Sequence, residues 1–216
     1  MPTIKAQDCM DKAEIILRDT SNGRFGETEL LGWFNDGERA VVGLKPDAYV
    51  KEEAVTLIAG INQSIPTTGM ALIGLSHNMG VGGETQGDII RLISRAHLDA
   101  QQPSWPTDTG SATVLFYMFD DRKPRIFQVY PKQPAVSMGS AWMTYTDTPA
   151  DIAKTDVILL ADIYAIPIQH YIVAMALAKD PAYSGVAAHH MGIFNSALGV
   201  KEKAEMQADP NIRVKE

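Results

Sequence analysis

The sequence predicts an α+β fold, in which a helical bundle formed by both chain ends carries an inserted small antiparallel β unit. Apolar side chains recur with helical spacing in residues 27–44 and again in residues 163–198. Between about residues 50 and 145, short β-branched and aromatic runs are broken by Gly, Pro, Asn and Asp, which is typical of small antiparallel strands. The predicted parts are a discontinuous bundle of residues 1–48 and 155–199, a β-rich insert of residues 49–154 and a charged tail of residues 200–216.

Two helices are predicted in the N-terminal part of the chain. The second covers residues 27–44, with Gly26 as its N-cap and Glu29 as half of a capping box. Pro46 ends this helix because it lacks an N–H group and restricts the residue before it. The first helix covers residues 4–18 and is expected to turn five side chains toward the core: Ala6, Cys9, Ala13, Ile16 and Leu17.

The middle of the chain contains six predicted strands. The clearest pair is a hairpin, because aromatic runs at residues 114–119 and 125–130 flank a polar turn. Residues 94–100 have the pattern of one or two helical turns, and residues 102–110 form a Pro-bearing loop. The strands are predicted at residues 51–58, 70–78, 88–93, 113–119, 125–131 and 139–146.

Two further helices are predicted in the C-terminal part. The third helix follows Asp162 and has Pro167 in its first turns, where a missing hydrogen bond should bend the helix unless it starts late or as a 3₁₀ turn. The fourth begins with Asp180 as N-cap and Pro181 at its first position. Gly199 is predicted to end it.

The composition is that of a globular protein that folds without disulfides. Of the 216 residues, 45% are hydrophobic, which allows a substantial core. The single cysteine, Cys9, allows no intramolecular disulfide, so we expect folding in a reducing compartment. No apolar run approaches the roughly 18 residues of a membrane helix. The net charge of −7 disfavours tight, sequence-independent binding to a phosphate backbone.

No group of residues has the spacing of a known catalytic, metal or cofactor site, and we predict none. The glycine-rich stretch Gly80–Glu84 lacks the Lys-Ser/Thr pair of a phosphate-binding loop, so we interpret it as a connection between strands. His189 and His190 are adjacent on a predicted helix, and their side chains diverge by about 100°. The alternative is an intracellular metal-dependent hydrolase that uses Asp162, His170 and one of these two histidines.

Two segments of the insert are candidate interfaces. Trp105 lies in a loop flanked by prolines, and aromatic side chains are enriched at interface hot spots. The hairpin turn carries Asp120, Asp121, Arg122 and Arg125, which are more charges than the turn itself needs. We therefore expect this turn to contact another protein.

Six stretches, in matching order over roughly residues 5–199, resemble the adaptor proteins of tailed bacteriophages. They are ELLGWFNDGER at residues 29–39, LKPDA at 44–48, NMG at 78–80, LDAQQPSW at 98–105, FDDRKPRIFQVYP at 119–131 and LADIY at 160–164. Two departures from the family pattern are Pro167, where the family usually has a helix former, and Gly26, which replaces a polar cap.

The resemblance implies a structural virion protein with no catalytic motif. It implies a homo-oligomeric ring, commonly of twelve copies, that lies in the neck of the virion between the portal protein and the next tail component. Such a ring would assemble in the host cytoplasm, let DNA pass through its channel without specific binding, and have no contact with a membrane. The charged turn at residues 120–125 would then contact a neighbouring subunit or the next tail component.

The tail is expected to bind the portal. Its seventeen residues, 200–216, are rich in Lys and Glu and lack an apolar stripe, so we expect them to be mobile in a free monomer. Ile212 and Val214 are the predicted apolar anchors. The predicted partners of acidic portal groups are Lys201, Lys203, Arg213 and Lys215.

Overall fold

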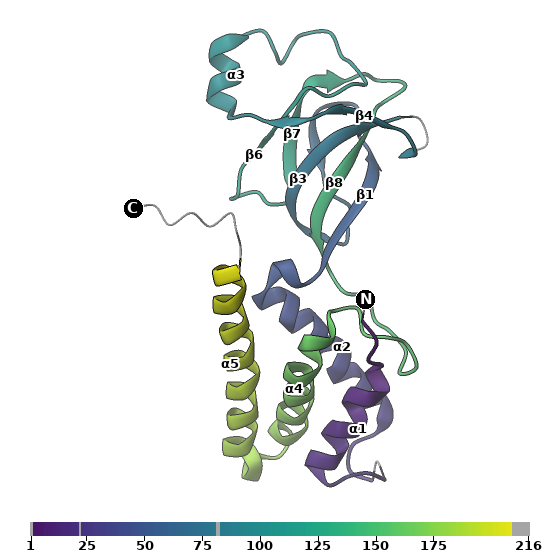
Figure 1. Ribbon diagram of the computed structural model, residues 1–216, viewed down its shortest axis with the longest axis vertical. Helices are drawn as coiled ribbons and strands as arrows, with labels where there is room; N and C mark the ends of the chain where they lie inside the picture. The colour runs from purple at the N-terminus through teal and green to yellow at the C-terminus, as the bar shows by residue number, and fades with distance from the viewer. Residues whose placement is uncertain (1, 22, 81–82, 209–216) are drawn as a thin grey trace. The chain divides into compact units, whose positions relative to one another are not determined.

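The computed structural model describes residues 2–21, 23–80 and 83–208, which form an α+β fold of α-helices and two four-stranded sheets (Figure 1). The chain divides into two compact units. One contains the segments Met1–Tyr49 and Pro149–Glu216, and the other contains Val50–Thr148. The α+β class predicted from the sequence is confirmed.

The first unit is helical and is organised around helix α4. Helices α1 (Ala6–Leu17), α2 (Glu27–Leu44) and α5 (Ser184–Ala208) all pack against α4 (Ala165–Ala178). Because it has neighbours on several sides, α4 is apolar around most of its circumference. The fully buried side chains of this core include Met10, Leu30, Phe34, Ile158, Leu160, Ile168, Ile172 and Phe194.

The predicted start of α2 is confirmed and one detail is wrong. Gly26 is the N-cap, and the helix ends at Leu44, before the 3₁₀ turn η1 (Pro46–Ala48). Glu29 forms no capping box, because its Oε1 accepts a hydrogen bond of 2.6 Å from the Lys179 ammonium group. In α1, Ile16 was expected in the core, but its side chain is 44% exposed.

Both C-terminal helices begin with a 3₁₀ turn. Turn η3 (Asp162–Tyr164) precedes α4, so Pro167 is the third residue of the α-helix, where an N–H group has no intrahelical partner to lose. At this position the proline breaks no hydrogen bond within the helix, so it gives no reason for the predicted bend. Turn η4 (Pro181–Tyr183) precedes α5, and the Asp180 carboxylate accepts a hydrogen bond of 3.0 Å from the N–H of Ala182.

The predicted end of the last helix at Gly199 is wrong. Helix α5 continues through Gly199 to Ala208. A glycine inside a helix costs about 1 kcal/mol relative to alanine but keeps its backbone hydrogen bonds, so it weakens a helix without stopping it. The first residues of the predicted tail are therefore helical.

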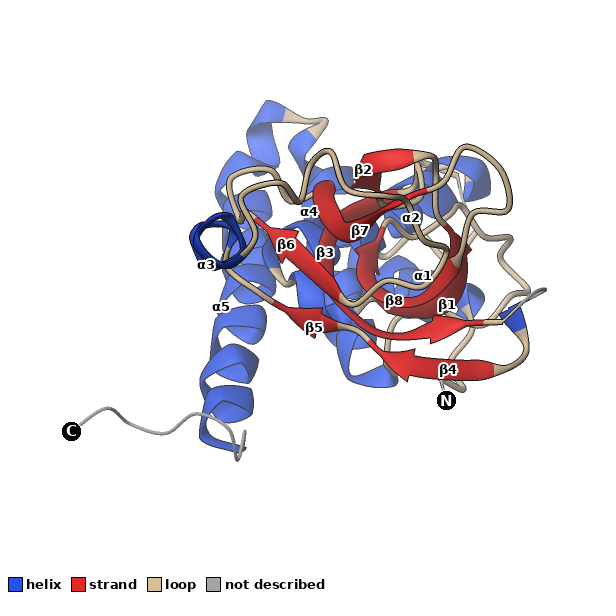
Figure 2. Ribbon diagram, turned by 90° about the horizontal axis from the view of Figure 1, so that it is seen from above, coloured by secondary structure: helices blue, strands red, loops and turns tan. Residues whose placement is uncertain are grey.

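The second unit consists of two sheets that share a core. The first has the order β1-β8-β3-β4 and the second β2-β7-β6-β5, with β5 parallel to β6 and the other pairs antiparallel (Figure 2). Leu72, Met143 and Tyr145 of the first sheet pack with Phe127 and Val129 of the second. The strands are β1 (Val50–Thr56), β2 (Gly60–Ser64), β3 (Gly69–Met79), β4 (Gln86–Ile89), β5 (Arg91–Leu92), β6 (Phe116–Phe119), β7 (Ile126–Gln133) and β8 (Ser140–Asp147).

Most of the predicted strands are confirmed, including the hairpin of β6 and β7. Strand β2 was not predicted, and the single strand predicted at residues 88–93 is two strands, β4 and β5. Helix α3 (Arg95–Gln101) is the predicted short helical segment, and its N-cap Ser94 accepts a hydrogen bond of 3.3 Å from the N–H of His97.

Gly139, the residue before β8, lies against the backbone of another segment. A Cβ atom at this position would come within 1.9 Å of the carbonyl oxygen of Ala112. Gly139→Ala should therefore destabilise the β unit by about 1–3 kcal/mol or more, the range of overpacking. Thermal and urea unfolding measure the effect, and Gly185→Ala, at a helical position with nothing within 4 Å, is the control. A Gly139→Ala variant as stable as the wild type would contradict this packing.

Candidate functional site

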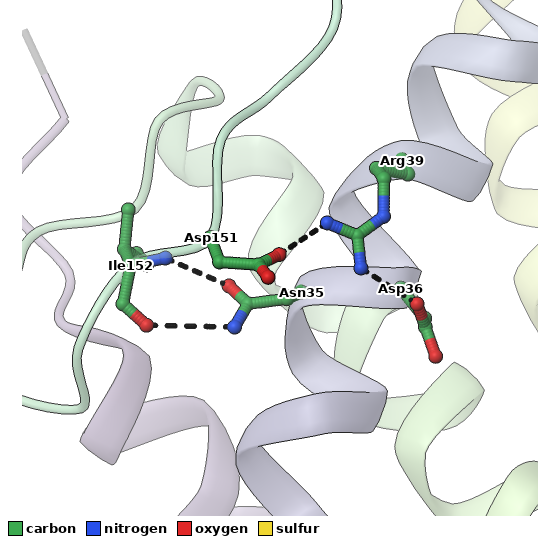
Figure 3. Close-up of polar contacts among 5 residues, drawn as sticks. All are labelled: Asn35, Asp36, Arg39, Asp151 and Ile152. Atoms are coloured by element: carbon green, nitrogen blue, oxygen red, sulfur yellow. Dashed lines mark hydrogen bonds and ion pairs between the residues drawn. The ribbon is translucent and has the colours of Figure 1, made fainter.

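Polar side chains on one face of α2 bind residues 151–160, the segment that follows the β unit. The Asn35 side chain is buried and binds both backbone groups of Ile152 (Figure 3). Its Oδ1 accepts a hydrogen bond of 3.1 Å from the Ile152 N–H, and its Nδ2 donates one of 3.4 Å to the Ile152 carbonyl. This paired contact holds residue 152 at one register against the helix.

One turn further along α2, Arg39 adds an ionic contact to the same segment. Its guanidinium donates hydrogen bonds to Asp36 at 2.7 Å and to Asp151 (Figure 3). The hydrogen bonds to these two carboxylates raise the pKa of Arg39. Because the Arg39 side chain is 37% exposed, the contact orients the segment more than it stabilises the fold.

Glu38 holds the next part of the segment from inside the core. It is fully buried, and its Oε1 accepts hydrogen bonds from the N–H groups of Leu159 at 2.8 Å and Leu160 at 3.3 Å. Its Oε2 has no hydrogen-bond partner among the described residues. Burial raises the pKa of Glu38, so the protein favours the protonated acid at this position. The carboxyl group serves the fold and faces no open pocket.

Cys9 is a buried thiol on α1. Burial raises its pKa to about 11, so the thiol stays protonated near neutral pH. A thiol in this state is a poor nucleophile and a small core side chain.

The alternative metal site does not assemble. Asp162 lies at the start of η3, where its carboxylate accepts hydrogen bonds from the N–H and the hydroxyl of Thr3, each of 2.8 Å. His170 and His190 meet across α4 and α5 with their Nδ1 atoms 2.9 Å apart, while His189 is exposed. In the described part of the chain no three His, Cys, Asp or Glu side chains are placed to hold a metal ion. The glycine-rich stretch connects β3 to β4, as predicted, and its residues 81–82 lie outside the described residues.

The charged hairpin turn projects its side chains into solvent. Asp120 serves the turn, because its Oδ1 accepts a hydrogen bond of 3.0 Å from the N–H of Arg122. Arg125 donates a hydrogen bond of 2.8 Å to the carbonyl of Thr67. Arg122 has a side chain that is 91% exposed, and among the described residues its guanidinium pairs with the Asp120 carboxylate, at 3.5 Å. Asp121 makes no hydrogen bond or ion pair with any residue that the structure describes.

A groove of about 700 Å³ lies beside this turn. Its walls include Asp121 and Lys123 from the turn, Ile126 and Gln128 from β7, and Arg95 from α3. Ile126, the first residue of β7, is 50% exposed and contributes an apolar side chain to the groove. The groove thus combines an apolar floor with charges of both signs.

Trp105 is placed differently from the prediction. Its side chain is only 2% exposed and packs with Leu98 and Met118. Its indole N–H donates a hydrogen bond of 2.7 Å to the Asp99 carboxylate. The ring anchors the loop after α3 to the second sheet, and in the single chain it leaves almost no exposed surface for a partner.

The predicted portal-docking residues lie at or beyond the end of α5. The backbone of Lys201 and Lys203 belongs to the C-terminal part of this helix. Ile212, Arg213, Val214 and Lys215 lie outside the described residues.

The polar face of α2 was not predicted from the sequence. Asn35 and Glu38 lie three residues apart, on the same helical face as the core residues Phe34 and Val41. Polar side chains within an apolar stripe are the available signal, because buried polar groups need hydrogen-bond partners from another segment.

Two comparisons with known proteins bear on function. A family model described as SU10 adaptor protein matches residues 4–214. A search of curated proteins finds no match. Among the described helices, none is both long and apolar enough to cross a membrane.

Glu38→Gln tests the buried carboxyl group. Glutamine keeps the oxygen that accepts from Leu159 and Leu160 and removes the charge. Because the folded-state pKa of Glu38 is raised, wild-type stability should fall as pH rises above about 4.5. The variant should therefore unfold at a higher temperature than the wild type at pH 7.5, and the difference should shrink toward pH 5.

The matched control is Glu84→Gln, the same chemical change at an exposed position. Glu38→Ala, which leaves two backbone N–H groups unpaired, should lose about 1–3 kcal/mol at every pH. A Glu38→Gln variant that is less stable than the wild type at pH 7.5 would show that the charge itself is needed.

Proposed function

The chain belongs to the SU10 adaptor protein family, a family of phage head-to-tail adaptors, and we propose that it forms a homo-oligomeric ring between the portal and the tail. The ring contains twelve copies, the number that the family resemblance implies, and lies in the neck of the virion after assembly in the host cytoplasm. The protein works by binding, without catalysis, metal or cofactor.

One observation carries this proposal. The family match runs from residue 4 to residue 214 and so includes both compact units. The buried polar groups agree with a structural role, because Asn35 and Glu38 both bind backbone groups of the same chain. We do not propose the metal-dependent hydrolase, because the Asp162 carboxylate accepts hydrogen bonds from Thr3 and the described residues bring no three metal-binding side chains together.

The hairpin turn at residues 120–125 is the proposed contact with a neighbouring subunit or with the next tail component. Arg122 and Asp121 are exposed and make few or no contacts within the described chain. Beside them lies the groove with exposed Ile126 as its apolar floor. Exposed charges around an apolar centre are a common arrangement at protein interfaces.

The C-terminal tail is the proposed contact with the portal. Ile212 and Val214 alternate with the basic residues Arg213 and Lys215 and supply the apolar anchors. Ordering a flexible segment costs roughly 1–2 kcal/mol per residue, so these anchors must be buried by the partner to compensate.

The hairpin contact predicts a defect in assembly without a defect in folding. Arg122→Ala with Arg125→Ala should leave the melting temperature almost unchanged and weaken ring formation or tail joining. Native mass spectrometry of the purified chain with portal rings measures ring formation, and complementation of infection measures tail joining. Arg91→Ala, an exposed arginine of the same β unit, is the control. Normal assembly and normal infection by the double variant would show that this segment is only a turn.

The tail contact predicts that truncation separates stability from binding. Removal of residues 200–216 should change the melting temperature of the monomer little and abolish or greatly weaken binding to isolated portal rings. Ile212→Ser with Val214→Ser should have the same effect on binding while it keeps every charge, and Ala204→Ser is the matched control. Unchanged portal affinity of the truncated chain would show that the tail takes no part in docking.

The channel role predicts weak DNA binding. A protein with a net charge of −7 should bind duplex DNA more weakly than about 10⁻⁶ M at physiological salt, because it has few phosphate contacts to offer. Fluorescence anisotropy with a labelled duplex measures this affinity for the chain alone and for the ring. Submicromolar binding by the ring would contradict passive passage of DNA.

A further inference from the structure

Two histidines form the polar contact between α4 and α5. The Nδ1 atoms of His170 and His190 are 2.9 Å apart, and their ring centroids are 5.1 Å apart. At this distance one Nδ1 must carry a proton and donate it, while the other accepts. The contact therefore requires that at least one of the two rings is neutral.

Among the described residues, the charged surroundings of this pair offer no compensating carboxylate. His189, the next residue on α5, is the other ionisable group that acts on both rings, and its ring lies 5.8 Å from that of His190. On α2, which packs on another side of α4, the charges of Asp36 and Arg39 shift the pKa of Tyr171 and not that of either histidine.

On the described residues of the remaining elements packed on these helices, no carboxylate shifts the pKa of either ring. On α1, the charges of Asp8 and Lys12 shift the pKa of Cys9. In η4, Tyr183 stacks with the Arg24 guanidinium, at 5.1 Å from the ring centroid. A second proton on the histidine pair is thus opposed by the charge of the first, and no described carboxylate lowers its cost.

We propose that the His170–His190 contact is a pH-sensitive latch, which holds α5 on α4 at neutral pH and loosens it in mild acid. The first proton added to the neutral pair binds the free Nε2 of the donor ring, so the proton between the two Nδ1 atoms, and with it the hydrogen bond, stays in place. The second proton makes both rings cationic donors, so no acceptor remains and the rings repel each other. The apolar contacts of Ala187, Phe194 and Leu198 then hold α5 without the polar contact.

The direction of the pH dependence follows from the state of the rings. Burial lowers the pKa of both His170 and His190 below the ordinary value of 6.5, and the neighbouring histidines lower it further. The unfolded chain therefore binds more protons than the folded chain below about pH 6.5, and stability is lost as pH falls through that range. In the same range the raised pKa of Glu38 changes stability in the opposite direction, so the latch is measured by the difference between the wild type and the histidine variants.

Thermal unfolding of the full chain at pH 7.5 and 5.5 tests the latch. The wild type should lose melting temperature between the two values, and His190→Gln and His170→Gln should each remove most of that loss. The double variant should remove no more than either single variant, because the two rings act together. His189→Gln, an exposed neighbour outside the hydrogen bond, should keep most of the loss.

A second measurement does not depend on the variants. Imidazole titration of the wild type by NMR should give two coupled transitions for His170 and His190, both below the ordinary histidine pKa of 6.5. Backbone hydrogen exchange, corrected for the intrinsic effect of pH, should rise in residues 184–199 at pH 5.5 more than in residues 6–17. Independent titration near pH 6.5, or an equal melting-temperature loss in all variants, would overturn the latch.

Discussion

The helical unit depends on the fastening of residues 151–160 to α2. The chain leaves this unit at Tyr49 and re-enters it at Pro149, so its core is completed by segments far apart in the sequence. Asn35, Glu38 and Arg39 bind the returning segment at Ile152, Leu159–Leu160 and Asp151. Closing so long a loop costs entropy, although the cost grows only slowly with loop length. These directed contacts fix where α4 begins, and α4 is the helix on which the other three pack.

The polar groups that stabilise the fold are separate from those that are exposed to partners. The buried polar groups Asn35, Glu38 and Cys9 lie in the core of the helical unit and serve folding. The groups available to partners are exposed, in the hairpin turn and in the groove beside it. An adaptor protein needs this division, because its fold must stay intact while its surfaces bind other components of the phage neck.

The sequence was sufficient where local signals agree with packing. The start of α2 at Gly26 and the turn between β6 and β7 were predictable, because capping and turn residues act within a few positions. Gly199 was misleading, since helix continuation there depends on the whole segment rather than on one residue. The burial of Trp105 was not predictable, because it depends on Leu98 and Met118, which a loop sequence does not reveal. The partner of Glu38 lies about 120 residues away, and no local pattern could identify it.

Native mass spectrometry of the purified full chain, alone and with isolated portal rings, tests the adaptor assignment most directly. The account predicts a complex whose added mass is a whole number of copies of this chain arranged on the portal, with twelve copies as the expected number. The dependence of this complex on the portal would show whether the ring forms before docking. A chain that stays monomeric with and without portal rings, and adds no mass to them, would contradict the account.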